Sequence, residues 1–161
     1  MVYQKILVAL DQSPLGEEVL QQAIALAQCF GSSLMLCHCI PVESQILSPY
    51  PSFYSEEMLN FSQMIQERLK QETTNTQAWL QQQSETAIAA GIPTETQIQI
   101  GEPGRYVRDL AKEWQADLII IGRRGLRGFQ ELFLGSVSNY VLHHAPCSVL
   151  VVQATPTSSE T

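Results

Sequence analysis

The residues of this chain that are best placed to do chemistry lie between positions 122 and 138, where glycine, arginine and serine follow one another closely. Gly122 and Gly125 would let a ligand approach the main chain without meeting a side chain. Gly135 and Ser136 precede a helical pattern, so the free N–H groups of a helix N-terminus and a hydroxyl group would face one space. Phosphate groups favour such a helix end. The segment is therefore expected to bind an anion.

The distribution of charge agrees with a small anionic ligand. The net charge of the chain is −7, which argues against a general nucleic-acid binder, because such proteins rely on lysine and arginine to neutralise backbone phosphates. Six of the nine basic residues lie between positions 105 and 127, and none lies between Lys5 and Arg68. Arginine also binds phosphate oxygens in a two-point geometry that lysine lacks.

The elements that must position this segment alternate between strand and helix. Short apolar runs predict five strands, at 6–10, 34–40, 94–100, 118–121 and 148–152. Helical patterns lie between them: one capped by Ser13 with Pro14 and closed by Gly31, then segments at about 55–90, 105–115 and 136–144. A helix of thirty-six residues is rare in a globular domain, so a break is expected at 73–76. The pattern predicts a doubly wound α/β fold with a parallel sheet and helices on both faces.

The spacing of glycine, two residues, glycine, nine residues, glycine and serine resembles the nucleotide-binding signature of the universal stress protein family, in its ATP-binding branch. The first strand with Asp11 and the last strand also resemble that family, so the resemblance covers nearly the whole chain. It implies the strand order 3-2-1-4-5 of a Rossmann-like, adenine nucleotide alpha hydrolase-like sheet. Asp11 and Gly122 would then face each other across one crevice.

The resemblance also implies a set of nucleotide-binding residues. Asp11 would accept hydrogen bonds from a sugar hydroxyl or an adenine amine, or hold a Mg²⁺ ion carried by the phosphates; otherwise it is an exposed loop residue. Arg124 would line the phosphate path, and Ser136 could bind phosphate, cap the helix or do both. Ala9 and Cys39 replace a proline and a small aliphatic residue of some family members. The complete predicted set is Ala9, Asp11, Cys39, Ile121, Gly122, Arg124, Gly125, Gly135, Ser136, Val137 and Ser138.

The other candidate groups indicate structure, not catalysis. His38 is expected to be a satisfied core or supporting histidine, and the four cysteines to be buried small hydrophobic residues. No catalytic triad, paired carboxylates or metal-ligand cluster is visible in the sequence. We expect one cytoplasmic domain over 1–153, a mobile segment at about 42–56, a disordered tail at 154–161 and no membrane span.

The sequence leaves three functions open. The first is a stress-response module that binds ATP with Mg²⁺, hydrolyses it slowly at most, and acts through an unknown protein partner. The second is an enzyme that transfers an adenylyl group. The third is an interaction module that binds AMP, a cyclic nucleotide or no nucleotide. The family resemblance further implies a homodimer formed through the last strand, whose exposed edge needs a cover.

Overall fold

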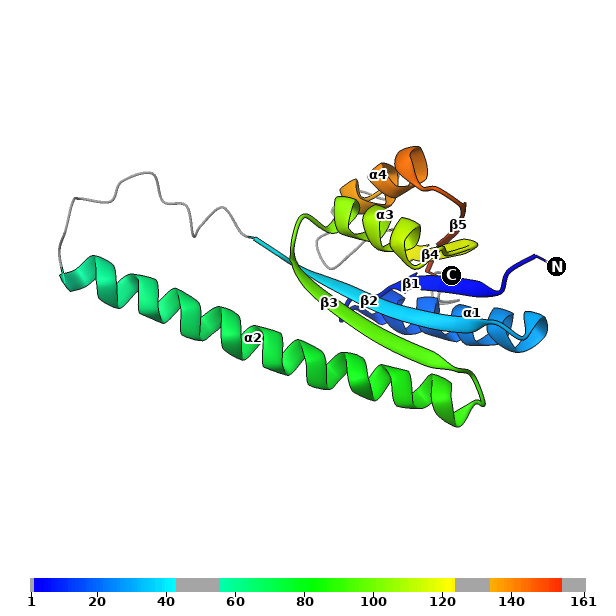
Figure 1. Ribbon diagram of the computed structural model, residues 1–161, viewed down its shortest axis with the longest axis horizontal. Helices are drawn as coiled ribbons and strands as arrows, with labels where there is room; N and C mark the ends of the chain where they lie inside the picture. The colour runs from blue at the N-terminus through cyan, green and yellow to red at the C-terminus, as the bar shows by residue number, and fades with distance from the viewer. Residues whose placement is uncertain (1, 43–55, 124–133, 155–161) are drawn as a thin grey trace, which may run out of the picture.

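The computed structural model describes residues 2–42, 56–123 and 134–154. Five strands form one parallel sheet in the order β3-β2-β1-β4-β5. The strands are β1 (Lys5–Ala9), β2 (Ser33–Pro41), β3 (Thr94–Gly101), β4 (Leu118–Gly122) and β5 (Ser148–Val152). The helices are α1 (Pro14–Phe30), α2 (Glu56–Ala89), α3 (Pro103–Glu113) and α4 (Ser136–His144). The predicted fold class and strand order are confirmed (Figure 1).

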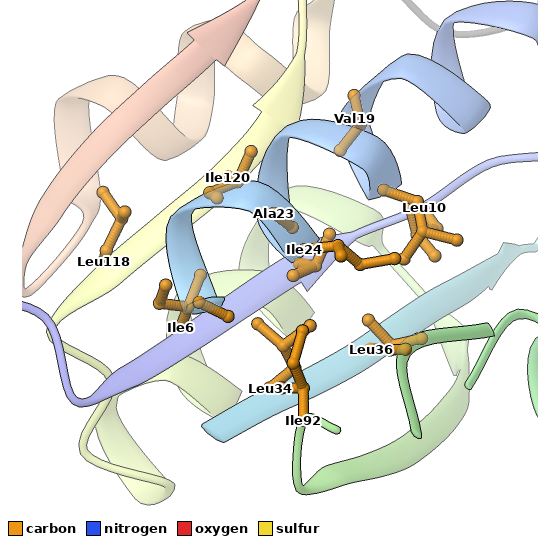
Figure 2. Close-up of a cluster of buried hydrophobic side chains, with 14 of the residues drawn as sticks. Ile6, Leu10, Val19, Ala23, Ile24, Leu34, Leu36, Ile92, Leu118 and Ile120 are labelled. Atoms are coloured by element: carbon orange, nitrogen blue, oxygen red, sulfur yellow. The ribbon is translucent and has the colours of Figure 1, made fainter. Parts of the chain in front are cut away.

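The helices cover both faces of the sheet because the central strands are apolar on both sides. Ile6 and Val8 of β1 belong to a cluster with residues of α1 and of the C-terminal half of α2. Figure 2 shows part of this cluster, with Ile6 near Ala23 and Ile24 of α1. Leu7, between Ile6 and Val8, belongs to the opposite cluster with α3 and α4. The alternation of side chains along a strand places successive residues on opposite faces. The core therefore forms two layers, one on each side of β1.

The first helix begins and ends as its sequence predicts. The hydroxyl of Ser13 accepts a hydrogen bond from the backbone N–H of Gly16 at 3.1 Å, and Pro14 is the first helical residue. Gly31 closes the helix in the left-handed conformation with φ of 69°, which costs glycine little. These caps fix where the chain leaves β1 and enters α1.

The second helix corrects a prediction, because α2 runs unbroken over 34 residues and has no break at 73–76. The threonines expected to interrupt it instead bond back to the helix. The hydroxyl of Thr73 donates to the carbonyl of Leu69 at 2.7 Å, and that of Thr74 donates to the carbonyl of Lys70 at 2.9 Å. Such bonds to the preceding turn satisfy the hydroxyls inside a helix. Thr76 is also buried, as part of the face of α2 that lies toward the sheet.

Two other features complete the fold. In the described part of the chain, no helix is both long and apolar enough to cross a membrane.

Cys37 and Cys39 are buried as expected, but Cys29 is exposed near the end of α1, so the prediction was wrong for that cysteine. The predicted segment at about 42–56 and the predicted tail lie almost wholly outside the described residues.

Candidate functional site

The crevice predicted from the sequence lies where the winding of the sheet reverses. β1 pairs with β2 on one side and with β4 on the other, so their connections run to opposite faces. The register sets Ala9 beside both Cys37 and Ile121. The residues that follow these positions, Asp11 and Gly122, therefore leave the sheet at the same edge. Open parallel sheets bind ligands at this kind of position.

Asp11 is half-buried and forms hydrogen bonds at the start of α1. Its Oδ1 atom accepts from the backbone N–H of Ser13 at 3.1 Å and also from the Ser13 hydroxyl. The turn is tight, because a Cβ atom at Gly16 would lie 2.2 Å from the carbonyl oxygen of Asp11. Within the described residues, Oδ2 accepts no hydrogen bond. One carboxylate oxygen thus supports the helix, and the other is available to a ligand.

His38 holds the end of β1 in place, a supporting role in line with the sequence prediction. Its Nδ1 atom lies 2.7 Å from the carbonyl oxygen of Leu10, and its ring meets that of Trp79 edge to face at 5.5 Å. The backbone N–H of Leu10 donates to the carbonyl of Cys37 at 2.9 Å. Both backbone groups of Leu10 are therefore bonded to β2, directly before Asp11. This contact could not be predicted from the sequence, because the partner of His38 is a backbone atom.

Ala9, Cys39 and Ile121 form the apolar part of the predicted site, on the face covered by α3 and α4. Burial, together with the negative charge of Glu102, raises the pKa of the Cys39 thiol to about 11. The thiol is therefore neutral at physiological pH and is a poor nucleophile or metal ligand. A neutral thiol presents a small apolar surface on this face of the sheet.

One backbone hydrogen bond joins the two ends of the segment 124–133, and a second one ties its start to β5. The N–H of Gly135 donates to the carbonyl of Arg123 at 2.8 Å, and the N–H of Arg123 donates to the carbonyl of Val152 at 2.8 Å. The Ser138 hydroxyl, which is buried, donates to the carbonyl of Gly122 at 2.6 Å. This hydroxyl hydrogen is already used, so a ligand contact from Ser138 would come from its backbone N–H. The junction fixes where the segment leaves β4 and enters α4.

The N-terminus of α4 carries no side-chain cap. Gly135 occupies the N-cap position, and no side chain of the described residues caps the helix there. The alternative that Ser136 caps this helix is therefore wrong, because Ser136 is its first helical residue and is exposed. Val137, the next residue, is half-buried against the α3 and α4 core. An uncapped N-terminus leaves backbone N–H groups to be satisfied by water or by a ligand.

Two of the predicted residues, Arg124 and Gly125, lie outside the described residues. The structure places the other nine at or next to the carboxyl edge of β1, β2 and β4. Two hollows among the described residues lie elsewhere, along β3. One of about 280 Å³ adjoins α3 and one of about 380 Å³ adjoins α2, and neither is lined by a predicted site residue.

The side chains at the crevice determine which kind of metal ion it could hold. Within the described residues, no three histidine, cysteine or acidic side chains lie together as metal ligands. The available oxygen of Asp11 suits a hard cation such as Mg²⁺, which prefers oxygen ligands and commonly uses one carboxylate with phosphates. The site therefore fits a cation that arrives with a phosphate ligand better than one held by the protein alone.

Comparisons with known proteins bear on the family and the fold of this chain. The model of the family described as "Universal stress protein family" matches residues 2–153. The universal stress protein Sll1388 of Synechocystis sp. is 56% identical over 153 residues, which are 95% of this chain and 99% of that protein. Among solved structures, the universal stress protein UspA from Lactobacillus plantarum has a TM-score of 0.76 at 25% identity, covering 94% of this chain and 99% of that chain.

Two further solved structures contain nucleotides. A universal stress protein in complex with cAMP has a TM-score of 0.67 at 22% identity, covering 96% of this chain and 100% of that chain. The universal stress protein from Archaeoglobus fulgidus in complex with dAMP has a TM-score of 0.57 at 24% identity, covering 94% of this chain and 98% of that chain. At these sequence identities, the likeness to the two structures shows a shared fold and no more.

Proposed function

Because the chain belongs to the universal stress protein family, we propose that it is an ATP-binding regulatory module of the stress response, with at most slow hydrolysis. The observation that carries this proposal is the uncapped N-terminus of α4, held beside the switch point by the bond between Gly135 and Arg123. A helix N-terminus supplies oriented N–H groups and a positive dipole end, both of which favour phosphate. The module would act through a protein partner of unknown identity.

The proposed arrangement assigns a part of the nucleotide to each side of the crevice. The phosphates lie against Gly122, Gly135, Ser136, Val137 and Ser138 at the α4 end. The base lies against the apolar surface of Ala9, Cys39 and Ile121. Oδ2 of Asp11 accepts a hydrogen bond from a ribose hydroxyl or an adenine amine, or contacts the Mg²⁺ carried by the phosphates. Arg124 and Gly125 belong to the phosphate side by their place in the sequence motif.

A second candidate ligand is a nucleotide with one phosphate group. Two structural neighbours were solved with cAMP and with dAMP. Both ligands share the adenine base with ATP, and cAMP also shares its ribose, whereas dAMP has 2′-deoxyribose. ATP is favoured here because the chain carries the full glycine and serine spacing, together with Arg123, Arg124 and Arg127 near it. A ligand with more phosphate groups can form charge-assisted hydrogen bonds with more of these arginines and backbone N–H groups.

The deciding experiment identifies the nucleotide directly. Nucleotide extracted from the purified protein is identified by mass, and calorimetric titrations then compare ATP, AMP and cAMP with and without Mg²⁺. We expect ATP to be retained and to bind most tightly, with product appearing only over hours. Tighter binding of AMP or cAMP would assign the second ligand class. Rapid turnover with an added acceptor would indicate adenylyl transfer, and the absence of any nucleotide binding would overturn the proposal.

We further propose a homodimer formed through β5, in the cytoplasm. β5 is an edge strand of the sheet, and its Leu150 is 37% exposed. Pairing with a second copy about a two-fold axis would satisfy the free backbone groups of this edge. Val151→Pro removes a backbone donor and should give monomer or insoluble protein. A wild-type particle of monomer mass in light scattering at micromolar concentration would contradict the dimer, and cell fractionation tests the location.

A further inference from the structure

One face of α2 carries apolar side chains in both halves of the helix, with two threonines between them, but the sheet covers only its C-terminal half. In that half Leu80 and Ala87 are fully buried in the core. The same face continues toward the N-terminus, at intervals of three or four residues, through Thr76, Thr73, Leu69, Ile65, Phe61 and Met58. In Figure 1 the N-terminal half of α2 projects beyond β3 and away from the other described elements. We call the residues Met58, Phe61, Ile65 and Leu69 the outer stripe.

Two of the four residues of the outer stripe, Met58 and Phe61, are exposed, and Ile65 and Leu69 are half-buried. Phe61 is 46% exposed and Met58 is 43% exposed, whereas Leu80 on the same face is 1% exposed. Met64, beside the stripe, is 60% exposed. An isolated helix of about 15 residues is marginal in water, because most helical stability in proteins comes from packing of an apolar face. The inner half of α2 supplies the helix nucleus, but the projecting half gains little stability from packing, so a partner that covers the stripe would stabilise it.

Charges beside the stripe indicate which partner fits. Glu57 and Arg68 lie on the same flank of the outer stripe, three helical turns apart. In the described part of the chain, neither side chain forms an ion pair within one copy. When two identical helices pack antiparallel about a two-fold axis, the same flank of each helix lies on the same side of the contact. Glu57 would then meet the partner's Arg68, and two-fold symmetry would form the same pair twice.

We infer that the outer stripe is covered by the outer stripe of a second copy of this chain, in an antiparallel helix pair. A two-fold axis close to Gln63 sets Phe61 against the partner's Ile65, and Met58 against the partner's Leu69. Parallel packing would bring opposite flanks together and would leave Glu57 without Arg68. The contact lies on the β3 side of the sheet, away from the β5 edge, and it requires no nucleotide. It is therefore independent of the function and the dimer proposed above.

A charge-reversal experiment in the full-length protein tests the pairing. Glu57→Arg places two positive charges together at both ends of the pair, and Arg68→Glu places two negative charges together. Sedimentation should show that each variant associates about tenfold more weakly through this contact than the wild type, since two favourable pairs become two repulsive ones. An equimolar mixture of the two variants should associate like the wild type, because the mixed pair restores opposite charges at both ends.

The control variant is Glu67→Arg, which makes the same charge change on the opposite face of the same helix. It should leave association unchanged, and helical content by circular dichroism should be the same for all variants. A contact through β5 would not respond to any of these changes. Equal effects of Glu57→Arg and Glu67→Arg, or a mixture no heavier than the single variants, would overturn the inference.

Amide hydrogen exchange gives a second, independent measurement. In the wild type, exchange over residues 58–72 should slow as the protein concentration rises, because pairing protects the helix. Protection that is unchanged on dilution would mean that the stripe is covered within one copy or not at all. Either result would show that no second copy covers it.

Discussion

The two helix N-termini that flank the switch point are built in opposite ways. The N-terminus of α1 is satisfied by neighbouring residues. Ser13 is its N-cap, Pro14 is its first helical residue, and Asp11 accepts a hydrogen bond from the backbone N–H of Ser13. α4 begins at Gly135 without a side-chain cap among the described residues. α3, at the same edge of the sheet, is also capped, since the carboxylate of Glu102 accepts from the N–H groups of Gly104 and Arg105.

This difference shows how one edge of a sheet can separate stability from binding. Capping a helix with a serine stabilises a protein by about 1 kcal/mol, so an uncapped end forgoes that stability. A ligand can satisfy the same N–H groups and contribute binding free energy in return. α1 thus anchors the crevice, and α4 is the helix end that we propose contacts the ligand. Variants at the two helix ends should accordingly affect different quantities.

The largest effect is expected from Gly135→Val. The backbone at Gly135 has φ of −59° and ψ of 157°, a conformation that valine also adopts readily, so the fold and melting temperature should persist. The new side chain would stand at the open end of α4, where the phosphates are proposed to lie. We expect ATP affinity to fall by about a hundredfold or more, a loss of about 2.7 kcal/mol, in calorimetric titration. Unchanged affinity in a folded variant would remove the phosphates from this helix end.

A smaller effect on both quantities is expected from Asp11→Ala. A residue that only contacted a ligand would affect affinity alone, but Oδ1 of Asp11 also accepts hydrogen bonds from the backbone N–H and the hydroxyl of Ser13. We therefore expect about a tenfold loss of affinity, and a decrease of about 1 kcal/mol in the free energy of unfolding. Calorimetric titration and thermal melting measure the two effects separately.

Asp11→Asn is the matched control for this prediction. Its amide oxygen can still accept from Ser13, so the stability should return toward that of the wild type. Its missing charge should keep the affinity low if a cation or a charge-assisted hydrogen bond is involved. Loss of stability with full affinity in both variants would assign Asp11 to the fold alone.

The fold could be predicted largely because its signals are local. The buried strands are short continuous apolar runs, and Ser13, Pro14 and Gly31 mark the ends of α1 by their own conformational preferences. The continuity of α2 could not be predicted in the same way. Threonine has a poor helix propensity, and only the structure shows Thr73 and Thr74 bonding to the preceding turn, with the inner half of α2 packed on the sheet.

The candidate site could be predicted as a set of positions but not as a set of contacts. The glycine and serine spacing identified the segment that joins β4 to α4. The contacts that hold it, from Gly135 to Arg123 and from Ser138 to Gly122, involve backbone oxygens that leave no pattern in the sequence. The same is true of His38 and Leu10. Ser136 would cap α4 only if the helix began one residue later, and sequence patterns do not locate a helix end to within one residue.

The smallest effect, and the most direct test of the difference between the two helix ends, is expected from Ser136→Ala. Ser136 is exposed at the first position of α4 and caps nothing in the described structure, so its removal should leave the melting temperature unchanged. If its hydroxyl donates to a phosphate oxygen, ATP affinity should fall about fivefold, the contribution of about one hydrogen bond.

Ser13→Ala is the counterpart at α1. It should lower the free energy of unfolding by about 1 kcal/mol, through loss of the cap, and change ATP affinity little. If Ser136→Ala lowered stability and Ser13→Ala lowered affinity, the division of roles between α1 and α4 would be reversed. Melting and titration of the two variants side by side therefore decide which helix end belongs to the fold and which to the ligand.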